Sequence, residues 1–218
     1  MRYSILTKLV NLFYPPRCMF CRRNFDDHAG LMICPKCLSF YEYETPSTVL
    51  LPDGHGNVHY ALNYRDDVRA AILRYKFSGM AQYAHGLAHF MLPFTGKFSE
   101  IDYISWVPIS PLRYISRTYD QSKLLAQALA KETGLEAIPT LRKIRHTRKQ
   151  STLGVDARRK NVINAYHTVH PDRIRGARIL LVDDIVTTGA TMAECSKVLY
   201  EAGAEYVFFI ALAHGSGK

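Results

Sequence analysis

The stretch Ile179-Leu180-Leu181-Val182-Asp183-Asp184-Ile185-Val186-Thr187-Thr188-Gly189-Ala190-Thr191 decides the fold of this 218-residue chain. Its first four residues are apolar, a run typical of a strand that is buried on both faces. The run delivers two adjacent carboxylates, Asp183 and Asp184, to the C-terminal end of that strand. A turn of small and hydroxyl-bearing residues follows at once, and such a turn favours a bound phosphate.

A helix is predicted directly after this turn. Thr191 and Glu194 have the spacing of a capping box, which places the turn at the N-terminus of the helix. Unpaired backbone N–H groups and the positive end of the helix dipole stabilise an anion there. A phosphate cradle beside two carboxylates fits a ligand that carries both a phosphate and hydroxyl groups, as ribose 5-phosphate does. The helix itself is indicated by apolar residues at helical spacing, at Met192, Cys195, Val198, Leu199 and Ala202.

This segment resembles the signature of the type I phosphoribosyltransferases, which bind 5-phosphoribosyl 1-pyrophosphate (PRPP). The resemblance implies that Asp183 and Asp184 engage the ribose 2′- and 3′-hydroxyls and the associated Mg²⁺. The alternative is an ordinary strand-to-helix junction in which the acids only cap the helix. The residues that the resemblance implies for the 5′-phosphate are Thr187, Thr188, Gly189, Ala190 and Thr191.

Four cysteines form a second pattern, Cys18-x2-Cys21 and, twelve residues later, Cys34-x2-Cys37. Two such pairs present four thiolates that close tetrahedrally on one Zn²⁺, so the predicted site is structural and not catalytic. A disulfide framework is the alternative, but we expect no secretory signal, and the fifth cysteine falls on the apolar face of the last predicted helix. The basic and aromatic residues among the cysteines either bind nucleic acid or form the module's own small core; they are Arg17, Arg22, Arg23, Lys36, Phe20, Phe25 and Phe40.

Length and composition indicate one medium-sized domain with a small addition. Hydrophobic residues make up 48% of the chain, which is enough for a substantial core. We expect an N-terminal helix and four-cysteine module over 1–45 and a larger domain over 55–218. No stretch approaches the roughly 20 apolar residues that span a bilayer. The amphipathic segment 1–14 is expected to pack on the protein or bind a partner, with contact to a membrane surface as the alternative.

Positive charge is concentrated between Leu141 and Lys160. Eight basic residues stand there against Asp156 alone, a local charge of +7 in a chain of net charge +9. The segment has no sustained periodicity, which is typical of a mobile loop with a helical or strand-like flank, and it suits either a pyrophosphate or a nucleic-acid backbone. A solvated run of charges is the alternative. The residues that we assign to one of these anions are Arg117, Arg142, Arg145, Arg148, Lys149 and Arg158.

The rest of the chain predicts strands that alternate with helices, and therefore a parallel sheet. Ligands of such sheets bind at the carboxyl ends of the strands. The loop Pro108-Ile109-Ser110-Pro111 emerges at that end together with the acid pair, so we add Ile109 and Ser110 to the phosphate-binding residues. Strands are expected at 58–64, 103–107, 179–182 and 207–212, and helices at 68–75, between Gly79 and 89, and at 124–129 before Gly134.

Several further runs extend the pattern over most of the chain: Tyr75-Lys76-Phe77-x-Gly79, Val107-Pro108-Ile109-Ser110, Arg117-x3-Gln121-Ser122 before Leu125-Ala126, and Arg142 through Thr147 and Gln150 to Arg158 and Asn161. In this order, and with the cysteine and acid pairs, they resemble the ComF family of competence proteins. An Arg-Gly-aromatic-Asn-Gln run is usual in that family. Here Thr118 stands in place of the glycine and Asp120 in place of the asparagine.

The resemblance implies an α/β fold of the type I phosphoribosyltransferase kind, a parallel sheet flanked by helices, with a small N-terminal zinc-binding module. It also implies a cytoplasmic protein of natural transformation, peripheral at the inner membrane, that assists incoming single-stranded DNA. Its implied partners are a DNA-uptake helicase and an inner-membrane channel.

Two functions stay open at this point. In the first, the protein handles single-stranded DNA and binds PRPP or a related phosphate with Mg²⁺. In the second, it is an active phosphoribosyltransferase: Asp183 and Asp184 steady the ribose as positive charge develops, and the basic segment closes over the leaving pyrophosphate. The basic segment and the cysteine module favour the first function, whereas the intact acid pair favours the second.

Overall fold

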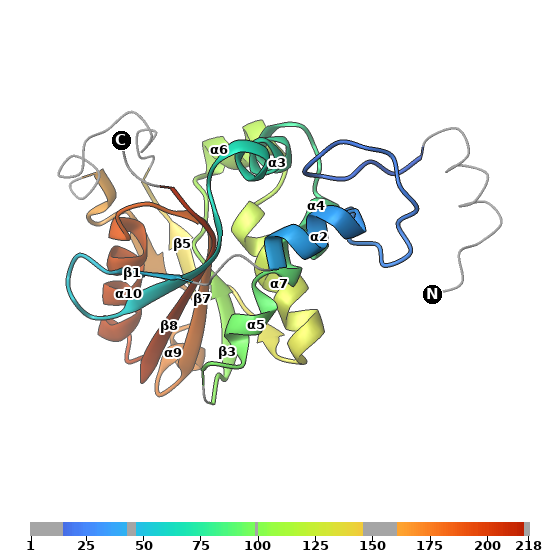
Figure 1. Ribbon diagram of the computed structural model, residues 1–218. Helices are drawn as coiled ribbons and strands as arrows, with labels where there is room; N and C mark the ends of the chain where they lie inside the picture. The colour runs from blue at the N-terminus through green and yellow to red at the C-terminus, as the bar shows by residue number, and fades with distance from the viewer. Residues whose placement is uncertain (1–14, 43–46, 99, 146–160, 216–218) are drawn as a thin grey trace.

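The computed structural model describes residues 15–42, 47–98, 100–145 and 161–215 (Figure 1). Within them the chain forms a six-stranded sheet in the order β1-β2-β8-β7-β3-β4 and a two-stranded sheet, β5-β6. Strands β2, β8, β7, β3 and β4 are parallel, and β1 is antiparallel at one edge, so the predicted parallel α/β sheet is confirmed. The strands are β1 (Ser47–Leu50), β2 (Asn57–Asn63), β3 (Tyr103–Trp106), β4 (Glu136–Ala137), β5 (Leu141–Lys143), β6 (Tyr166–Thr168), β7 (Arg178–Val186) and β8 (Tyr206–His214).

Strand β7 lies inside the sheet, between β8 and β3, and is buried on both faces as predicted. Leu180 and Val182 belong to one hydrophobic cluster, and Ile179 and Leu181 belong to a second cluster on the opposite face. The strand is longer than predicted, because it continues through both aspartates to Val186. The acid pair is therefore held by the sheet itself and not by a loop.

Helices cover both faces of the large sheet. Figure 1 shows α10 on one side and α3, α4 and α7 on the other, and the cores on the two sides agree with this division. Helix α7 ends at Gly134, which adopts a left-handed backbone (φ 74°) and terminates the helix as predicted. The helices are α2 (Pro35–Glu42), α3 (Asp66–Phe77), α4 (Tyr83–His89), α5 (Leu92–Thr95), α6 (Pro111–Arg117), α7 (Gln121–Thr133), α9 (Pro171–Ile174) and α10 (Ala190–Glu201).

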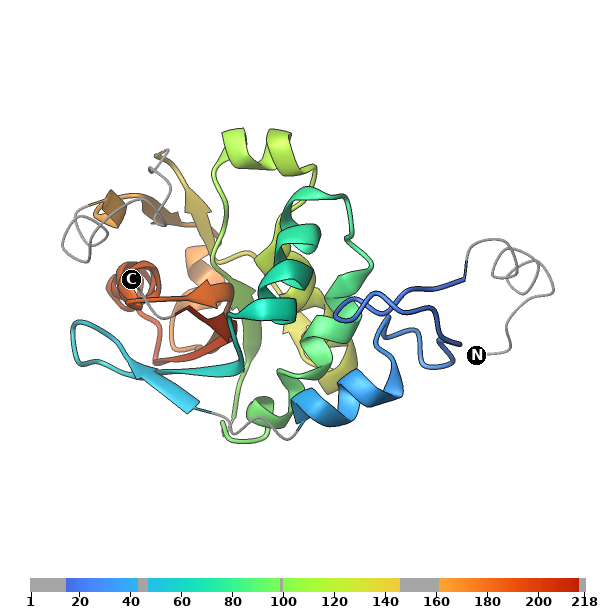
Figure 2. The same cartoon turned by 45° about the horizontal axis from the view of Figure 1, so that its top comes forward.

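The cysteine module packs on α4 and extends from one end of the molecule (Figure 2). Met19 and Phe20 are buried in the same hydrophobic cluster as Leu180 and Val182 of β7. The contact with α4 is close at Gly86, where an added Cβ would lie 1.9 Å from the carbonyl oxygen of Leu31. The module therefore shares a core with the larger domain. The predicted helix within 1–14 lies outside the described residues.

Candidate functional site

The acid pair stands at the carboxyl end of β7, and its two members engage different elements. Asp183 Oδ1 accepts a hydrogen bond from Ser122 Oγ at 2.9 Å and another from the backbone N–H of Asp184 at 2.8 Å. Asp184 Oδ2 pairs with Lys76 Nζ at 2.8 Å, and these two side chains are only 10% and 13% exposed. Ser122 lies in the first turn of α7 and Lys76 in the last turn of α3, so two helices of one layer hold the acid pair.

Burial raises the pKa of Asp183 to about 7, and the neighbouring negative charge of Asp184 acts in the same direction. The hydrogen bonds from Asp184 N–H and Ser122, together with the Lys76 ammonium, oppose this shift. Asp183 is thus close to half-protonated at neutral pH. Such a carboxylate is stabilised by a ligand that brings a cation or a hydroxyl donor, which is the expected behaviour of a binding group.

Lys76 is missing from the predicted site residues, although it neutralises one of the two acids. It comes from the last turn of α3, and its partner Asp184 lies on β7. The signal for it was the Tyr75-Lys76-Phe77 run, which carried the family resemblance but was given no role. The structure supplies that role, because only the fold brings α3 and the end of β7 together.

Arg117, which we assigned to an anion, ends α6 beside the acid pair. Its Nη1 donates to Gln121 Oε1 at 2.8 Å, and its guanidinium carbon lies 4.9 Å from the ring centroid of Phe77. Burial lowers the pKa of Arg117, and the carboxylate of Asp184 opposes this shift. Gln121 and Phe77 therefore orient the guanidinium, which interacts electrostatically with the two aspartates at the end of β7.

The two departures from the usual family run have structural explanations. Asp120 caps α7 through Oδ1, which accepts from Lys123 N–H at 3.2 Å, and its Oδ2 accepts from Ile109 N–H at 3.0 Å. Thr118 has a left-handed backbone (φ 68°), the conformation that a glycine adopts without strain. The predicted phosphate ligand Ile109 thus gives its N–H to Asp120, while Ser110 is buried at the start of α6.

The turn after β7 does lead into a helix N-terminus, but the predicted capping box is wrong. Gly189 is the N-cap of α10, with a left-handed φ of 72°, so Thr191 already lies inside the helix. Glu194 Oε1 instead accepts a hydrogen bond from the backbone N–H of Asn164 at 2.7 Å. An added Cβ at Gly189 would lie 3.0 Å from Leu51 Cδ2, so this turn favours glycine for both its conformation and its packing. The remaining turn residues are half-buried or buried: Thr187, Thr188, Ala190 and Thr191.

The predicted basic segment divides into different environments. Arg142 is exposed on β5, whereas Arg145 Nη2 donates to the backbone carbonyls of Asn161 (3.3 Å) and Ile163 (2.6 Å). Arg148, Lys149 and Arg158 lie outside the described residues.

Lys143 is one of the eight basic residues of this segment, but its side chain is not solvated. It is buried, its Nζ donates to Tyr166 Oη at 2.9 Å, and burial lowers its pKa to about 8. The strand-like flank expected for this segment is β5, and the alternative of a solvated run of charges is wrong at Lys143. The alternation of β5 turns Lys143 inward while Arg142 and Ile144 face out.

The four N-terminal cysteines converge as predicted. Their Sγ atoms all lie within 4.8 Å of one another, and those of Cys21 and Cys34 are 3.7 Å apart. A tetrahedral Zn²⁺ with Zn–S bonds of about 2.3 Å places its sulfurs about 3.8 Å apart, so this donor set fits zinc. Cys18, Cys21, Cys34 and Cys37 are all free thiols, as is Cys195, which is buried separately in α10. The disulfide alternative finds no support in this geometry.

The aromatic residues of the module separate into a core and a surface. Phe20 is 2% exposed and packs on Tyr41 and Phe90, with centroid distances of 4.4 and 5.9 Å. Phe40 is 65% exposed. Phe20 therefore belongs to the core, whereas the ring of Phe40 is open to solvent.

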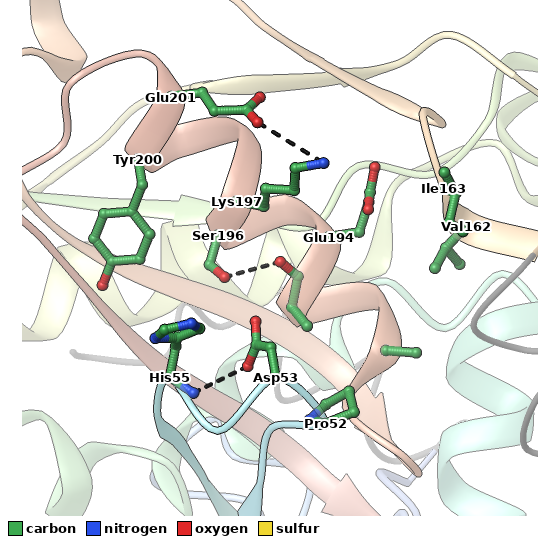
Figure 3. Close-up of a pocket in the computed structure, with 12 residues that line it drawn as sticks. Pro52, Asp53, His55, Val162, Ile163, Glu194, Ser196, Lys197, Tyr200 and Glu201 are labelled. Carbon is green, nitrogen blue, oxygen red and sulfur yellow. Dashed lines mark hydrogen bonds and ion pairs between the residues drawn. The ribbon is translucent and has the colours of Figure 1, made fainter.

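A large cavity of about 840 Å³ lies elsewhere, on the outer face of α10 (Figure 3). Tyr200 and Lys197 project from α10 toward it, and His55 and Asp53 belong to the turn between β1 and β2. The acid pair does not line this cavity. Among the described residues, no helix is both long and apolar enough to cross a membrane.

The chain is similar to a protein-family model, to relatives in sequence and to solved structures. A family model described as the phosphoribosyl transferase domain matches residues 121–218. Competence protein ComFC of Streptococcus pneumoniae is 31% identical over 199 residues, which cover 87% of this chain and 84% of that protein. The DNA utilization protein YhgH of Escherichia coli K12 is 30% identical over 155 residues, 66% of each chain.

Other similarities are shorter or weaker. Competence protein F of Haemophilus influenzae is 34% identical over 103 residues, 46% of this chain, and the match spans only 45% of that protein. Among solved structures, the allosteric regulatory enzyme of purine biosynthesis gives a TM-score of 0.41 at 23% identity, covering 62% of this chain and 26% of that one. Adenine phosphoribosyltransferase of Saccharomyces cerevisiae also gives 0.41, at 16% identity, covering 81% and 89%.

We expect the purified protein to carry about one zinc ion per chain, because four thiolates at this spacing complete a closed site. Cys18→Ser and Cys37→Ser should lower both the metal content, measured by plasma mass spectrometry, and the melting temperature. Cys195→Ser is the matched control, since it alters a buried thiol remote from the cluster and should retain the metal. Freshly reduced parent protein without zinc would refute the assignment.

Neutralising Asp183 and neutralising Asp184 should change the stability of the folded protein in opposite directions. The raised pKa of Asp183 makes its ionisation costly, so stability falls as pH rises from about 4 to about 7. Asp183→Asn should therefore stabilise the free protein at pH 8, by at most about 4 kcal/mol, and this gain should shrink toward pH 5. Asp184→Asn leaves the Lys76 ammonium unpaired and should destabilise by about 3 kcal/mol. Urea unfolding at both pH values checks this, and equal effects of the two variants would contradict it.

Proposed function

This chain belongs to the ComF family of competence proteins, and from that premise we propose that it is a DNA-uptake factor. It handles incoming single-stranded DNA and binds PRPP at the carboxyl edge of its sheet. The relatives named competence protein and DNA utilization protein support the first part, and the match to ComFC extends over 84% of that protein. The acid pair, held rigidly on β7 beside the start of α10, is the observation that carries the second part.

For the PRPP site, we assign the ribose hydroxyls to the two aspartates and the 5′-phosphate to the turn that starts α10. The N-terminus of α10 offers backbone N–H groups to an anion, and residues 187–191 surround that point. Carboxylate oxygens are the ligands that Mg²⁺ prefers, so Asp183 and Asp184 are the residues that would hold it. When bound, the ion would offset the charge of the pyrophosphate.

For DNA, the proposal is supported by charge and by exposed rings. The chain carries a net charge of +9, and Arg142 is exposed on β5. On the cysteine module, Arg23 and Lys36 are exposed, as is Phe40. Basic groups that neutralise phosphates, interleaved with rings that stack on bases, are typical of proteins that bind single strands without sequence preference. We place this activity in the cytoplasm, at the inner-membrane uptake channel and with a helicase partner, as family membership suggests.

The second candidate function is active phosphoribosyl transfer, and the intact acid pair is the observation that favours it. Asp183 and Asp184 would then stabilise the positive charge that develops on the ribose, while basic residues from 142–160 would hold the leaving pyrophosphate. An assay of pyrophosphate release from PRPP separates the two candidates. Release with one of the candidate bases, independent of single-stranded DNA, would favour the enzyme, and no release with any base would favour the DNA-uptake factor.

PRPP with Mg²⁺ should raise the melting temperature, because a ligand that binds only the folded state stabilises it by mass action. At a hundredfold excess over Kd the shift should be roughly 5–10 °C for a domain of this size. Asp183→Asn combined with Asp184→Asn should remove most of the shift. Asp53→Asn, an exposed acid between β1 and β2, is the control and should keep it. A double variant that responds as the parent does would place the ligand elsewhere.

Single-stranded DNA should bind with little sequence preference and with a steep dependence on salt. Each phosphate neutralised on a single strand contributes about −0.7 to the slope of log affinity against log salt concentration. Replacing Arg142, Arg148 and Lys149 by Ala should therefore lower the magnitude of the slope by about 2. A control that removes the same charge elsewhere, with Ala at the exposed Arg69, Lys131 and Lys197, should change it less. Equal effects of the two triple variants would mean that only net charge matters, and the DNA role of this segment would be lost.

A further inference from the structure

Three consecutive side chains at the end of α3 join three parts of the molecule. Arg74 Nη2 donates to the backbone carbonyl of Met19, in the cysteine module, at 2.5 Å. Tyr75 Oη donates to the backbone carbonyl of Gln121, at the start of α7, at 2.8 Å. Lys76 then pairs with the acid pair on β7. One helical turn thus contacts both the cysteine module and the PRPP site that we propose.

Arg74 contacts the module directly beside a predicted zinc ligand. Met19 directly follows Cys18 and lies between the first two predicted zinc ligands. A zinc ion with four thiolates carries a formal charge of −2, which favours a cation at its edge. Arg74 Nε is buried and, within the described part of the chain, has no hydrogen-bond partner. A buried N–H of a guanidinium that lacks an acceptor is costly unless a nearby negative centre stabilises the cation.

The packing around this contact leaves little freedom for independent movement. Gly86 on α4 admits no Cβ against the carbonyl of Leu31, and Phe20 packs on Phe90 with ring centroids 5.9 Å apart. Tyr75, in the same turn as Arg74, is fully buried. Close-packed contacts of this kind transmit a displacement instead of absorbing it. These contacts fix the module on α4, and the hydrogen bond from Arg74 to Met19 is the separate contact by which a change in the module reaches the last turn of α3.

We propose that Arg74 is a positioning residue that couples the metal state of the cysteine cluster to the PRPP site. The metal-loaded cluster holds Arg74, Arg74 fixes the last turn of α3, and that turn aims Lys76 at Asp184. The inference rests on the proposed PRPP site for its ligand. Coupling between two sites is reciprocal, so PRPP must strengthen retention of the metal by the same factor by which the metal strengthens binding of PRPP.

The chain offers a matched control for this proposal. Arg22 Nη1 donates to Tyr83 Oη at 3.1 Å, so it also joins the module to the helical layer. This contact ends on α4, and not on α3. Arg22→Ala therefore weakens the same interface without touching the turn that carries Lys76.

The decisive measurement is the affinity for PRPP with Mg²⁺, determined by calorimetry on zinc-loaded full-length proteins. Arg74→Gln should lower this affinity by about fivefold or more, the lower end of typical couplings between sites. Arg74→Lys, which keeps the charge and a donor, should restore part of it. Arg22→Ala should lower the melting temperature but leave the affinity unchanged. Equal losses of affinity in Arg74→Gln and Arg22→Ala, or no loss in either, would overturn the proposal.

A second readout does not depend on PRPP. Amide hydrogen exchange of residues 75–78 should be faster in zinc-loaded Arg74→Gln than in zinc-loaded Arg22→Ala, because only the first frees the end of α3. If the parent protein does not bind PRPP, the proposed ligand is wrong, and this comparison still decides whether Arg74 fixes the turn. Equal exchange in both variants would mean that it does not.

Discussion

The buried ion pair between Lys76 and Asp184 is the interaction on which the arrangement at the carboxyl edge depends. It ties the end of α3 to β7, and the hydrogen bond from Ser122 to Asp183 ties the start of α7 to the same strand. Two adjacent carboxylates in a buried position repel each other, so the edge is stable only while neighbouring elements supply a cation and donors. The ion pair and the hydrogen bond therefore hold α3 and α7 against the end of β7, where they compensate the negative charge of the acid pair.

The sequence was most informative where the pattern is long and continuous. The buried run of β7, the stripe of α7 and the cysteine spacing each involve many residues with one consistent requirement, and all three were predicted correctly. The edge strands β1 and β4 were not predicted, because strands of four and two residues are too short to show a period. The role of Lys76 was also missed, because it depends on a partner far along the chain.

Errors arose where backbone conformation overrode side-chain spacing. Thr191 and Glu194 have the spacing of a capping box, but the left-handed Gly189 starts α10 before Thr191. Lys143 sits in a run of positive charge, but the alternation of β5 buries it against Tyr166. Strain and unfavourable burial also concentrate near the edge, at Thr118 and at Asp183, and such local costs are commonly found at functional sites.

The position of β8 has a consequence for how the chain is made. This strand, Tyr206–His214, comes last among the described elements, yet it lies between β2 and β7. Strand β2 can pair early with β1, but β8 must be synthesised before it can join β2 to β7, and contacts between such distant segments form slowly. Until then the edges of β2 and β7 that pair with β8 stay without it, and unpaired strand edges make nascent chains prone to aggregate. The cysteine cluster precedes all of these strands in the chain, so it can bind a metal ion during this delay, before the core that receives the module is complete.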